Sequence, residues 1–209
     1  WWVQDAAARL PVSLLGAGTG SRILDLCAAP GGKTAQSAAA GSHVIAVDFS
    51  ESRLNRLKEN MARLNLEVDV VTSDVLTYNP QENHDFILLD APCSSTGTIR
   101  RHPEILHTRK QKTVDELAVL QTKMLDHAVS LLNKGGVLVY SVCSMQPEEG
   151  PDQIKALLDR HGSLKRKEIK TEELEGLEQS ILESGDVQTL AHHMSDGMDG
   201  FFISRLIKS

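Results

Sequence analysis

A chain of 209 residues, of which 41% are hydrophobic and 24% charged, has the size and composition of one globular domain with a full core. Its apolar runs fall far short of the roughly 20 residues that a membrane-spanning helix needs, which argues against a membrane protein. The formal net charge of −6 argues against indiscriminate binding to nucleic acid, although it is compatible with a local basic groove.

The three cysteines, Cys27, Cys93 and Cys143, are an odd number and show no C-x-x-C spacing. This pattern disfavours a disulfide framework and a closed zinc site, and no metal is expected. The first residues, Trp1 to Asp5, lack the basic start of a signal peptide. We therefore expect a protein of the reducing cytoplasm.

Short apolar runs alternate with amphipathic stretches along the chain. Strands are predicted over residues 22–26, 43–48, 68–72, 86–89, 137–140 and 201–207. Helices are predicted over residues 5–15 with a break near Pro11, 33–40, 50–64 with Ser50 as N-cap, 113–132 with Lys134–Gly136 ending it, and 147–161. Residues 171–190 are acidic and are expected to be helical in part or mobile. This alternation predicts the α/β class, a parallel sheet with helices on both faces, in a single domain over residues 1–209.

The loop after the first strand reads D-L-C-A-A-P-G-G-K-T from Asp25 to Thr34. Free backbone N–H groups and a helix start favour a ligand at such a loop. A phosphate loop would need Gly where Cys27 stands, and Pro30 interrupts it; a dinucleotide fingerprint would need G-x-G-x-x-G, which Gly31-Gly32 does not supply. S-adenosylmethionine, which has no phosphates, is the third candidate ligand, and a tight turn without a ligand is the fourth interpretation.

Four aspartates lie at the ends of successive predicted strands: Asp25, Asp48, Asp74 and Asp90. Asp48 is suitably placed to accept hydrogen bonds from both ribose hydroxyls of a nucleoside, and Asp74 to meet an adenine amino group. A lone Asp at a strand end is usually a cap or a turn former. Four in succession predict a line of carboxylates along one edge of the sheet.

Two cysteines open from predicted strand ends, Cys93 in D-A-P-C-S-S-T-G and Cys143 in Y-S-V-C-S. A phosphatase would carry Arg six positions after Cys93, where Ile99 stands instead. A cysteine in a small-residue loop is by default a buried small hydrophobe, but two of them beside Asp90 favour a catalytic role. Cys27 has no such partner and is interpreted as packing or as a backbone contact.

The motifs D-L-C-A-A-P-G-G-K-T, D-A-P-C-S-S-T-G and Y-S-V-C-S occur in this order along the chain. Together they resemble the Sun/Fmu-type (NOL/NOP/Sun) RNA cytosine-5 methyltransferases. V-Q-D-A-A-A near the start, R-H-P-E from Arg101 and D-G-F-F-I from Asp199 extend the likeness nearly end to end. The chain departs from the family at Val142, where Thr is usual, and the RNA-binding region that usually precedes the catalytic part is not expected within residues 1–209. The resemblance implies a Rossmann-like S-adenosylmethionine-dependent methyltransferase fold, with a mostly parallel seven-stranded sheet and helices on both faces.

The resemblance also implies the chemistry. Cys143 would attack carbon 6 of a cytosine, so that carbon 5 takes the methyl group. Asp90 would hold the pyrimidine edge, Cys93 would assist proton loss and product release, and Lys33 would position the base or the cofactor. The implied cofactor-binding residues are Cys27, Ala28, Ala29, Pro30, Gly31, Gly32, Lys33, Asp48, Asp74 and Asp90.

The implied substrate is RNA of the small ribosomal subunit, with an unstacked target cytosine, and the protein is expected to act as a monomer. A cation near Cys143 is needed to favour its thiolate, and Lys33, Arg100 and Arg101 are candidates. The expected RNA-facing surface is the basic stretch Arg100, Arg101, His102, His107, Arg109, Lys110 and Lys112, which could also be a solvated charge run. Transfer RNA as substrate, and a non-catalytic assembly factor that binds S-adenosylmethionine or RNA, remain alternatives.

Overall fold

The computed structural model describes all 209 residues, and its centre is one eight-stranded sheet. Seven strands lie in the order β3-β2-β1-β4-β5-β8-β6, and β7 pairs with β8 beside this row. The parallel strands are β1 (Arg22–Leu26), β2 (His43–Asp48), β3 (Asp69–Thr72), β4 (His84–Asp90) and β5 (Leu132–Val142). β8 (Phe201–Lys208) runs antiparallel to β5, β6 (Leu164–Arg166) and β7 (Val187–Thr189). The predicted fold class is confirmed.

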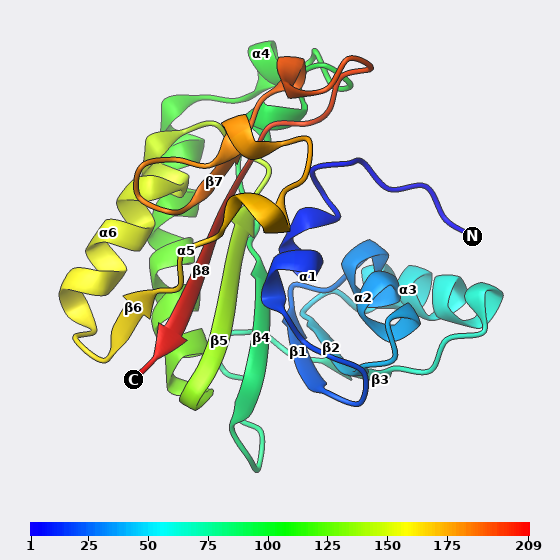
Figure 1. The fold of residues 1–209 in the computed structure, drawn as a ribbon. Coiled ribbons are helices and arrows are strands. Elements are labelled where there is room, and N and C mark those ends of the chain that lie inside the picture. Colours follow the sequence, from blue (N-terminus) through cyan, green and yellow to red (C-terminus); the bar gives the residue numbers. More distant parts are fainter.

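Helices cover both faces of the sheet (Figure 1). The helices are α1 (Leu10–Leu15), α2 (Gly32–Ala39), α3 (Glu51–Leu64), α4 (Ile105–Thr108), α5 (Gln111–Ser130) and α6 (Pro151–Arg160). Successive side chains of a strand point to opposite faces. In β4, Leu88 therefore packs in the cluster that contains α1, whereas Ile87 and Leu89 pack in the cluster that contains α5 and α6.

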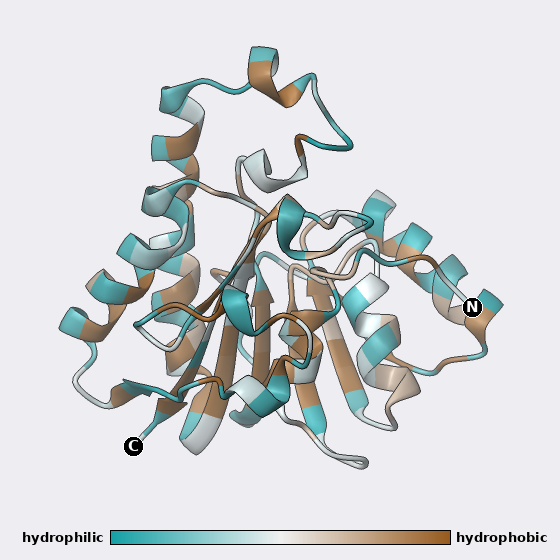
Figure 2. Cartoon of the chain, turned by 45° about the horizontal axis from the view of Figure 1, so that its top comes forward, coloured by the Kyte–Doolittle hydropathy of each residue, from teal (hydrophilic) through white to brown (hydrophobic).

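The strands are hydrophobic along nearly their whole length, because both faces of the parallel sheet are covered (Figure 2). The outward faces of the helices are hydrophilic in the same view. None of the helices combines the length and the hydrophobicity that a membrane crossing requires.

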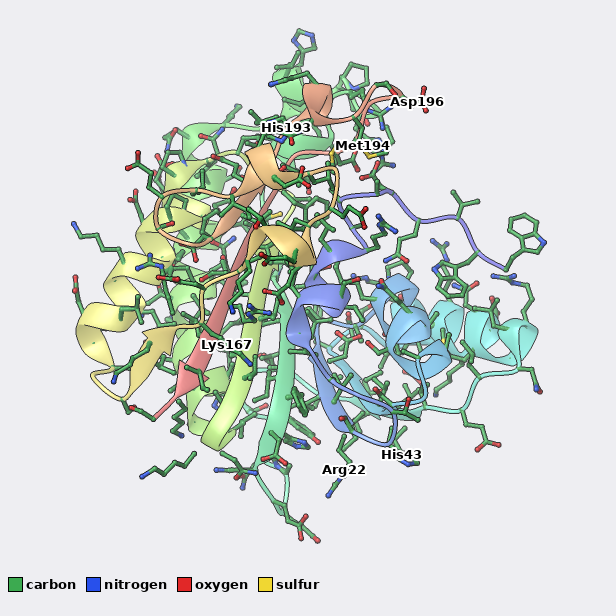
Figure 3. The ribbon with its side chains drawn as sticks, viewed as in Figure 1. Arg22, His43, Lys167, His193, Met194 and Asp196 are labelled. Carbon is green, nitrogen blue, oxygen red and sulfur yellow. The ribbon has the colours of Figure 1, made fainter.

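The carboxyl ends of the parallel strands all point to one end of the molecule. Arg22 and His43 begin β1 and β2 and lie at the opposite end, whereas His193, Met194 and Asp196 lie at the carboxyl end, near α4 (Figure 3). The loops that follow β1, β2, β4 and β5 therefore meet at the same edge of the sheet, which is where open α/β sheets bind ligands.

Three helix predictions need correction. Pro11 does not break a helix over residues 5–15 but lies in the first turn of α1, where a missing N–H group is harmless. Lys134–Gly136 does not end α5, which stops at Ser130; these residues lie inside β5. The predicted helix over residues 147–161 is divided at Gly150, and Pro151 begins α6 after a short 3₁₀ turn.

The acidic segment 171–190 contains no α-helix. It forms two 3₁₀ turns and the three-residue strand β7, which pairs with β8. The strand β6 was not predicted. Both short strands are held at the sheet by pairing with a single partner, β8, rather than by a hydrophobic pattern of their own.

Candidate active site

A cavity of about 600 Å³ opens at the carboxyl ends of the parallel strands. One part of its wall comes from the loops after β1 and β2, and another part from the loops after β4 and β5. The lining residues are Cys27, Ala29, Pro30, Asp48, Phe49, Arg53, Asp74, Val75, Asp90, Ala91, Pro92, Cys93, Ser95, Leu120, Met124 and Cys143.

The loop between β1 and α2 divides the predicted cofactor-binding residues into two groups. Cys27, Ala29 and Pro30 line the cavity, whereas Ala28 donates its N–H to Val47 in the neighbouring strand and is buried. Gly31-Gly32 lines a separate hollow near Trp2. Gly31 has a φ of +102°, and a Cβ there would lie 2.9 Å from Leu57 Cγ, so only glycine fits this turn against α3.

Asp48 is held rigidly at the end of β2. Its Oδ2 accepts hydrogen bonds from the Ala29 N–H at 3.2 Å and forms an ion pair with Arg53 Nη1 at 3.3 Å. Its Oδ1 accepts from the Ser50 N–H at 3.0 Å. Arg53 Nη2 also donates to the Ala29 carbonyl. Arg53 in α3 therefore contacts both Asp48 and the loop between β1 and α2.

Sequence reasoning missed the most exposed aromatic side chain of the site. Phe49 directly follows Asp48, lines the cavity and is 69% exposed. Asp74 lines the same part of the cavity, and its Oδ1 accepts from the Leu76 N–H at 2.9 Å, as expected for a turn-forming Asp. An exposed aromatic immediately after a strand-end aspartate would have been a usable signal.

Asp25 differs from the other three aspartates. It is buried within β1 and does not line the cavity, so the predicted line of carboxylates consists of Asp48, Asp74 and Asp90. Thr34 Oγ1 donates to Asp25 Oδ2 at 2.6 Å, while Oδ1 has no hydrogen-bond partner. Burial raises the pKa of Asp25 to about 7, against the opposing effect of the Thr34 hydrogen bond.

Asp90 is oriented from two sides at the end of β4. Lys33 Nζ donates to its Oδ2 at 2.8 Å, and Ser141 Oγ donates to its Oδ1 at 2.7 Å. The Lys33 side chain is only 11% exposed and its Nζ lies 5.1 Å from the centre of the Phe201 ring. Lys33 therefore reaches Asp90 from beneath the cavity and does not itself line it.

The structure brings the two predicted thiols together. Cys93 Sγ and Cys143 Sγ are 3.5 Å apart at the cavity wall, and Cys143 Sγ lies 3.5 Å from Ser95 Oγ. The hydrogen bond from Cys93 lowers the pKa of Cys143, and Ser95 and Lys33 act in the same direction, against burial and the charge of Asp90. The same hydrogen bond, together with burial, raises the pKa of Cys93 well above its usual range. Cys143 is thus the more acidic thiol of the pair, and Cys93 is the thiol that more strongly keeps its proton.

Arg100 and Arg101 were the other candidates for a positive charge near Cys143. Both are bonded to the buried Asp199, Arg101 through its Nε and Nη2 and Arg100 through its Nη2 at 3.8 Å. Lys33 is a cation that lowers the pKa of the Cys143 thiol, and Arg101, although it is paired with Asp199, also interacts electrostatically with Cys143.

Cys27 has the opposite character. Burial, and next the charge of Asp48, raise the pKa of its thiol, which stays protonated. It has a φ of +65°, uncommon for a residue with a side chain, and it lines the cavity.

A buried glutamate that the sequence did not indicate ties the two thiol loops together. Glu149 Oε1 accepts from the Ser94 N–H at 2.8 Å and from Gln121 Nε2 at 3.1 Å. Its Oε2 accepts from Ser94 Oγ and Ser144 Oγ, each at 2.5 Å. Ser94 follows Cys93 and Ser144 follows Cys143, so one carboxylate holds both loops. Tyr140 Oη donates to the Glu149 carbonyl at 2.7 Å and fixes the turn that carries it.

Two glycines also position the Cys143 loop. The Gly97 N–H donates to the Cys143 carbonyl at 3.0 Å, and the Gly200 N–H donates to the Gly97 carbonyl at 2.8 Å. A Cβ on Gly97 would lie 2.0 Å from the Gly200 carbonyl oxygen, which is too close for any other residue. Val142, where the resembling family has Thr, is fully buried in the hydrophobic cluster with α5 and α6.

The family assignment follows from comparison with known proteins. The sequence profile described as 16S rRNA methyltransferase RsmB/F matches residues 12–207. This chain belongs to the RsmB/F family. A curated relative, Ribosomal RNA small subunit methyltransferase B of Yersinia enterocolitica, is 45% identical over 99% of this chain and 46% of its own length. The chain spans about half the length of the curated relatives it matches.

Two solved structures share the fold of this RsmB/F-family chain. The structure of NSun6 from Pyrococcus horikoshii with SFG has a TM-score of 0.84 and 29% identity, covering 99% of this chain and 53% of that one. A methyltransferase homolog protein from Pyrococcus horikoshii has a TM-score of 0.81 and 28% identity, covering 100% and 68%. The resemblance that the three motifs indicated is therefore confirmed at the level of family and fold.

Proposed function

We propose that residues 1–209 form a catalytic domain that transfers a methyl group from S-adenosylmethionine to carbon 5 of a cytosine in RNA. The observation that carries this proposal is the pair of thiols of Cys93 and Cys143, 3.5 Å apart, in the cavity that Cys27, Ala29, Pro30 and Asp48 also line. A protein that only bound the cofactor would have no use for two thiols at this wall. The family description and the name of the Yersinia relative support small-subunit ribosomal RNA as the substrate.

The part of the cavity near β1 and β2 fits S-adenosylmethionine, which supplies the methyl group. The Cys27–Pro30 loop offers close backbone approach, and the fixed Asp48 carboxylate keeps lone pairs for ribose hydroxyls. Phe49 and Val75 supply apolar surface for a flat purine, and Asp74 lies beside them for an exocyclic amino group. The glycines 31 and 32 shape this loop and are outside the cavity.

Cys143 acts as the nucleophile. Its thiolate is favoured by the Cys93 hydrogen bond, by Ser95 and by Lys33, and it forms a bond to carbon 6 of the cytosine. The electron pair of the 5,6 double bond moves onto carbon 5 and the conjugated N3 end of the ring, so that carbon 5 becomes a nucleophile. Carbon 5 would then take the methyl group of S-adenosylmethionine, with S-adenosylhomocysteine as the leaving group. Asp90, held by Lys33 and Ser141, stabilises the polarised pyrimidine edge through its N3 and amino group.

Cys93 completes the reaction. In the free protein its pKa is raised chiefly by its hydrogen bond to Cys143. Once Cys143 is bonded to carbon, that hydrogen bond and the nearby negative charge disappear, and the Cys93 thiol can release its proton to solvent and become a thiolate. Cys93 can then accept the proton from carbon 5, after which the bond between carbon 6 and Cys143 breaks and the thiolate leaves.

The cavity also sets conditions on the substrate and the surroundings. Cys143 is partly buried at the cavity wall, so a paired and stacked cytosine cannot reach it and the base must be unstacked. All the groups named above come from one chain, which supports action as a monomer. Both thiols must be reduced, which fits a reducing compartment.

The full-length protein tests this proposal with small-subunit ribosomal RNA and S-adenosylmethionine labelled in its methyl group. Cys143→Ala should abolish methyl transfer, by at least about 10³-fold, because no other group replaces the thiolate. Calorimetric affinity for S-adenosylhomocysteine should be unchanged. Turnover that survives in this variant would reject Cys143 as nucleophile.

Cys93→Ala gives the complementary result. It should leave the first bond intact and stop product release, so that a protein–RNA adduct accumulates and resists denaturants in a gel. If no adduct forms during turnover, the release role of Cys93 is wrong. Bisulfite sequencing of ribosomal RNA from cells lacking the gene would identify the target cytosine, and the same sequencing of transfer RNA tests the alternative substrate.

A further inference from the structure

A second hollow, of about 400 Å³, adjoins the active-site cavity on the side of α4. Ser95 lines both, so the two spaces meet at the residue that contacts Cys143. The rest of its wall comes from Thr98, Arg101, His102, Glu104, Ile105, Thr108 and Arg109. We call it the Arg109 hollow.

Arg109 is the cation of this hollow whose charge is not shared with a carboxylate. Arg101 is bonded to Asp199, and the His102 ring lies 3.2 Å from Glu104. Arg109 makes no ion pair, and its single hydrogen bond runs from Nε to the Ser94 carbonyl at 3.0 Å. Both of its Nη groups are therefore available to a ligand.

The uncommitted edge of a guanidinium suits an anion with two oxygens in one plane, a carboxylate or a phosphate. The position of the hollow decides between them. A nucleotide whose base enters the cavity at Cys143 brings its own phosphodiester groups to the cavity rim, and the Arg109 hollow joins that rim at Ser95. A free carboxylate has no comparable reason to arrive there.

We propose that the Arg109 hollow binds a phosphodiester group next to the target cytidine, with the two Nη groups of Arg109 as the principal donors. The inference rests on the proposed function and names how the substrate backbone is held. Because Arg109 Nε holds the carbonyl of Ser94, a phosphate bound to Nη also restrains the loop with Cys93 and Ser95. Arg109 thus couples the binding of the RNA backbone to the position of the loop that carries the Cys93 thiol.

The basic stretch around Arg109 supplies a matched control. Lys112 has the same charge and lies three residues further on, but it is exposed, faces Glu116 at 3.7 Å and does not line the hollow. Arg109→Met and Lys112→Met each remove one positive charge from the same surface. A general electrostatic attraction would respond to both variants alike, whereas a phosphate site responds to the first.

The test uses the full-length protein and transcribed small-subunit ribosomal RNA over a range of salt concentrations. Arg109→Met should raise the Kd for RNA about tenfold and reduce the slope of log K against log salt by about one, with Lys112→Met near wild type. The Kd for S-adenosylhomocysteine should be unchanged in both, which shows that the variants are folded. Arg109→Lys should keep the salt slope and lower kcat, because a lysine retains the charge but loses the Nε contact with Ser94.

An unchanged Kd and salt slope in Arg109→Met would overturn the inference, and a lower kcat alone would assign Arg109 to holding the Ser94 loop. The proposed function fails in a different way. In that case the wild-type protein would methylate no RNA, and the Arg109 hollow would lose its substrate as well.

Discussion

The two ends of the active-site cavity each rest on a buried carboxyl group, and the two groups are treated in opposite ways. Asp25 lies beneath the cofactor loop and receives one hydrogen bond, from Thr34, while its Oδ1 receives none. Glu149 lies beneath the thiol loops and receives four, from Ser94 N and Oγ, Ser144 Oγ and Gln121 Nε2. Neither group has a basic partner within ion-pair distance.

The number of donors explains what each carboxyl does. Four hydrogen-bond donors satisfy Glu149, so this carboxylate needs no cationic partner and can join the two loops by hydrogen bonds alone. Lys33 can then act on Cys143 without a second cation bound at Glu149. One donor does not satisfy Asp25, and burial raises its pKa to about 7. The thiol end is thus fixed by hydrogen bonds, whereas the cofactor end contains a group that titrates near neutral pH.

Removing the Glu149 carboxylate should have the largest effect. Glu149→Ala removes the shared acceptor of four buried donors. The Ser94 N–H then has no partner, while Gln121 Nε2 keeps the Pro92 carbonyl and the Ser94 and Ser144 hydroxyls keep each other. With the cavity that the side chain leaves, the free energy of unfolding should fall by about 3–5 kcal/mol. Glu149→Gln keeps one acceptor oxygen and should lose about 1–3 kcal/mol. Urea unfolding measures both, and the rate of alkylation of Cys143 by iodoacetamide reports whether the thiol pair is still formed.

The cofactor affinity separates this effect from general damage. In Glu149→Gln the affinity for S-adenosylhomocysteine should stay at the wild-type value while kcat falls, because the Cys27–Pro30 loop does not contact Glu149. Equal losses in kcat and in cofactor affinity would show that the two ends of the cavity are not independent.

Asp25→Asn should act in the opposite direction, by stabilising the protein. The unfolded chain releases this proton near pH 3.8, whereas the folded protein keeps it up to about pH 7. The wild type therefore loses stability relative to Asp25→Asn as pH rises from 4 to 7, by no more than about 4 kcal/mol, and the difference is constant above pH 7. Urea unfolding from pH 4 to 8 measures this, with Asp159→Asn on the exposed face of α6 as the control for the same change of side chain. If the stability difference between the wild type and Asp25→Asn does not change with pH, the pKa of Asp25 is not raised by folding, and the contrast with Glu149 fails.

The same two regions show what the sequence could predict. β1, β2 and α3 begin and end where the apolar runs and the Ser50 cap indicate, because buried parallel strands and capped helices are local patterns. Lys134–Gly136 misled because glycine marks a helix end and a strand irregularity equally well. Gly135, with a φ of +79°, lies in β5 where the pairing with β4 shifts register between His84 and Phe86.

For the candidate site, the residue types after each strand indicated Asp48, Asp90, Cys93 and Cys143. The role of Glu149 could not be predicted, because it depends on contacts between loops 50 residues apart, Ser94 and Ser144, that no local pattern records. Asp25 was misplaced for the reverse reason: the sequence shows a strand-end carboxyl but not its burial.

The smallest predicted effect tests whether the single donor to Asp25 matters. Thr34→Val removes the hydroxyl with little change of volume, and it should cost about 1 kcal/mol at pH 8, where Asp25 is ionised, and less at pH 5, where it is protonated. Ser37→Ala is the matched control, since the buried Ser37 hydroxyl on the same helix donates to the Lys33 carbonyl and not to a carboxyl. Its effect should not vary with pH. If the stability lost by Thr34→Val is the same at pH 5 and pH 8, as it is for Ser37→Ala, Thr34 contributes packing and does not stabilise the ionised Asp25 carboxylate. Asp25 would then have no effective hydrogen-bond donor even in the wild type.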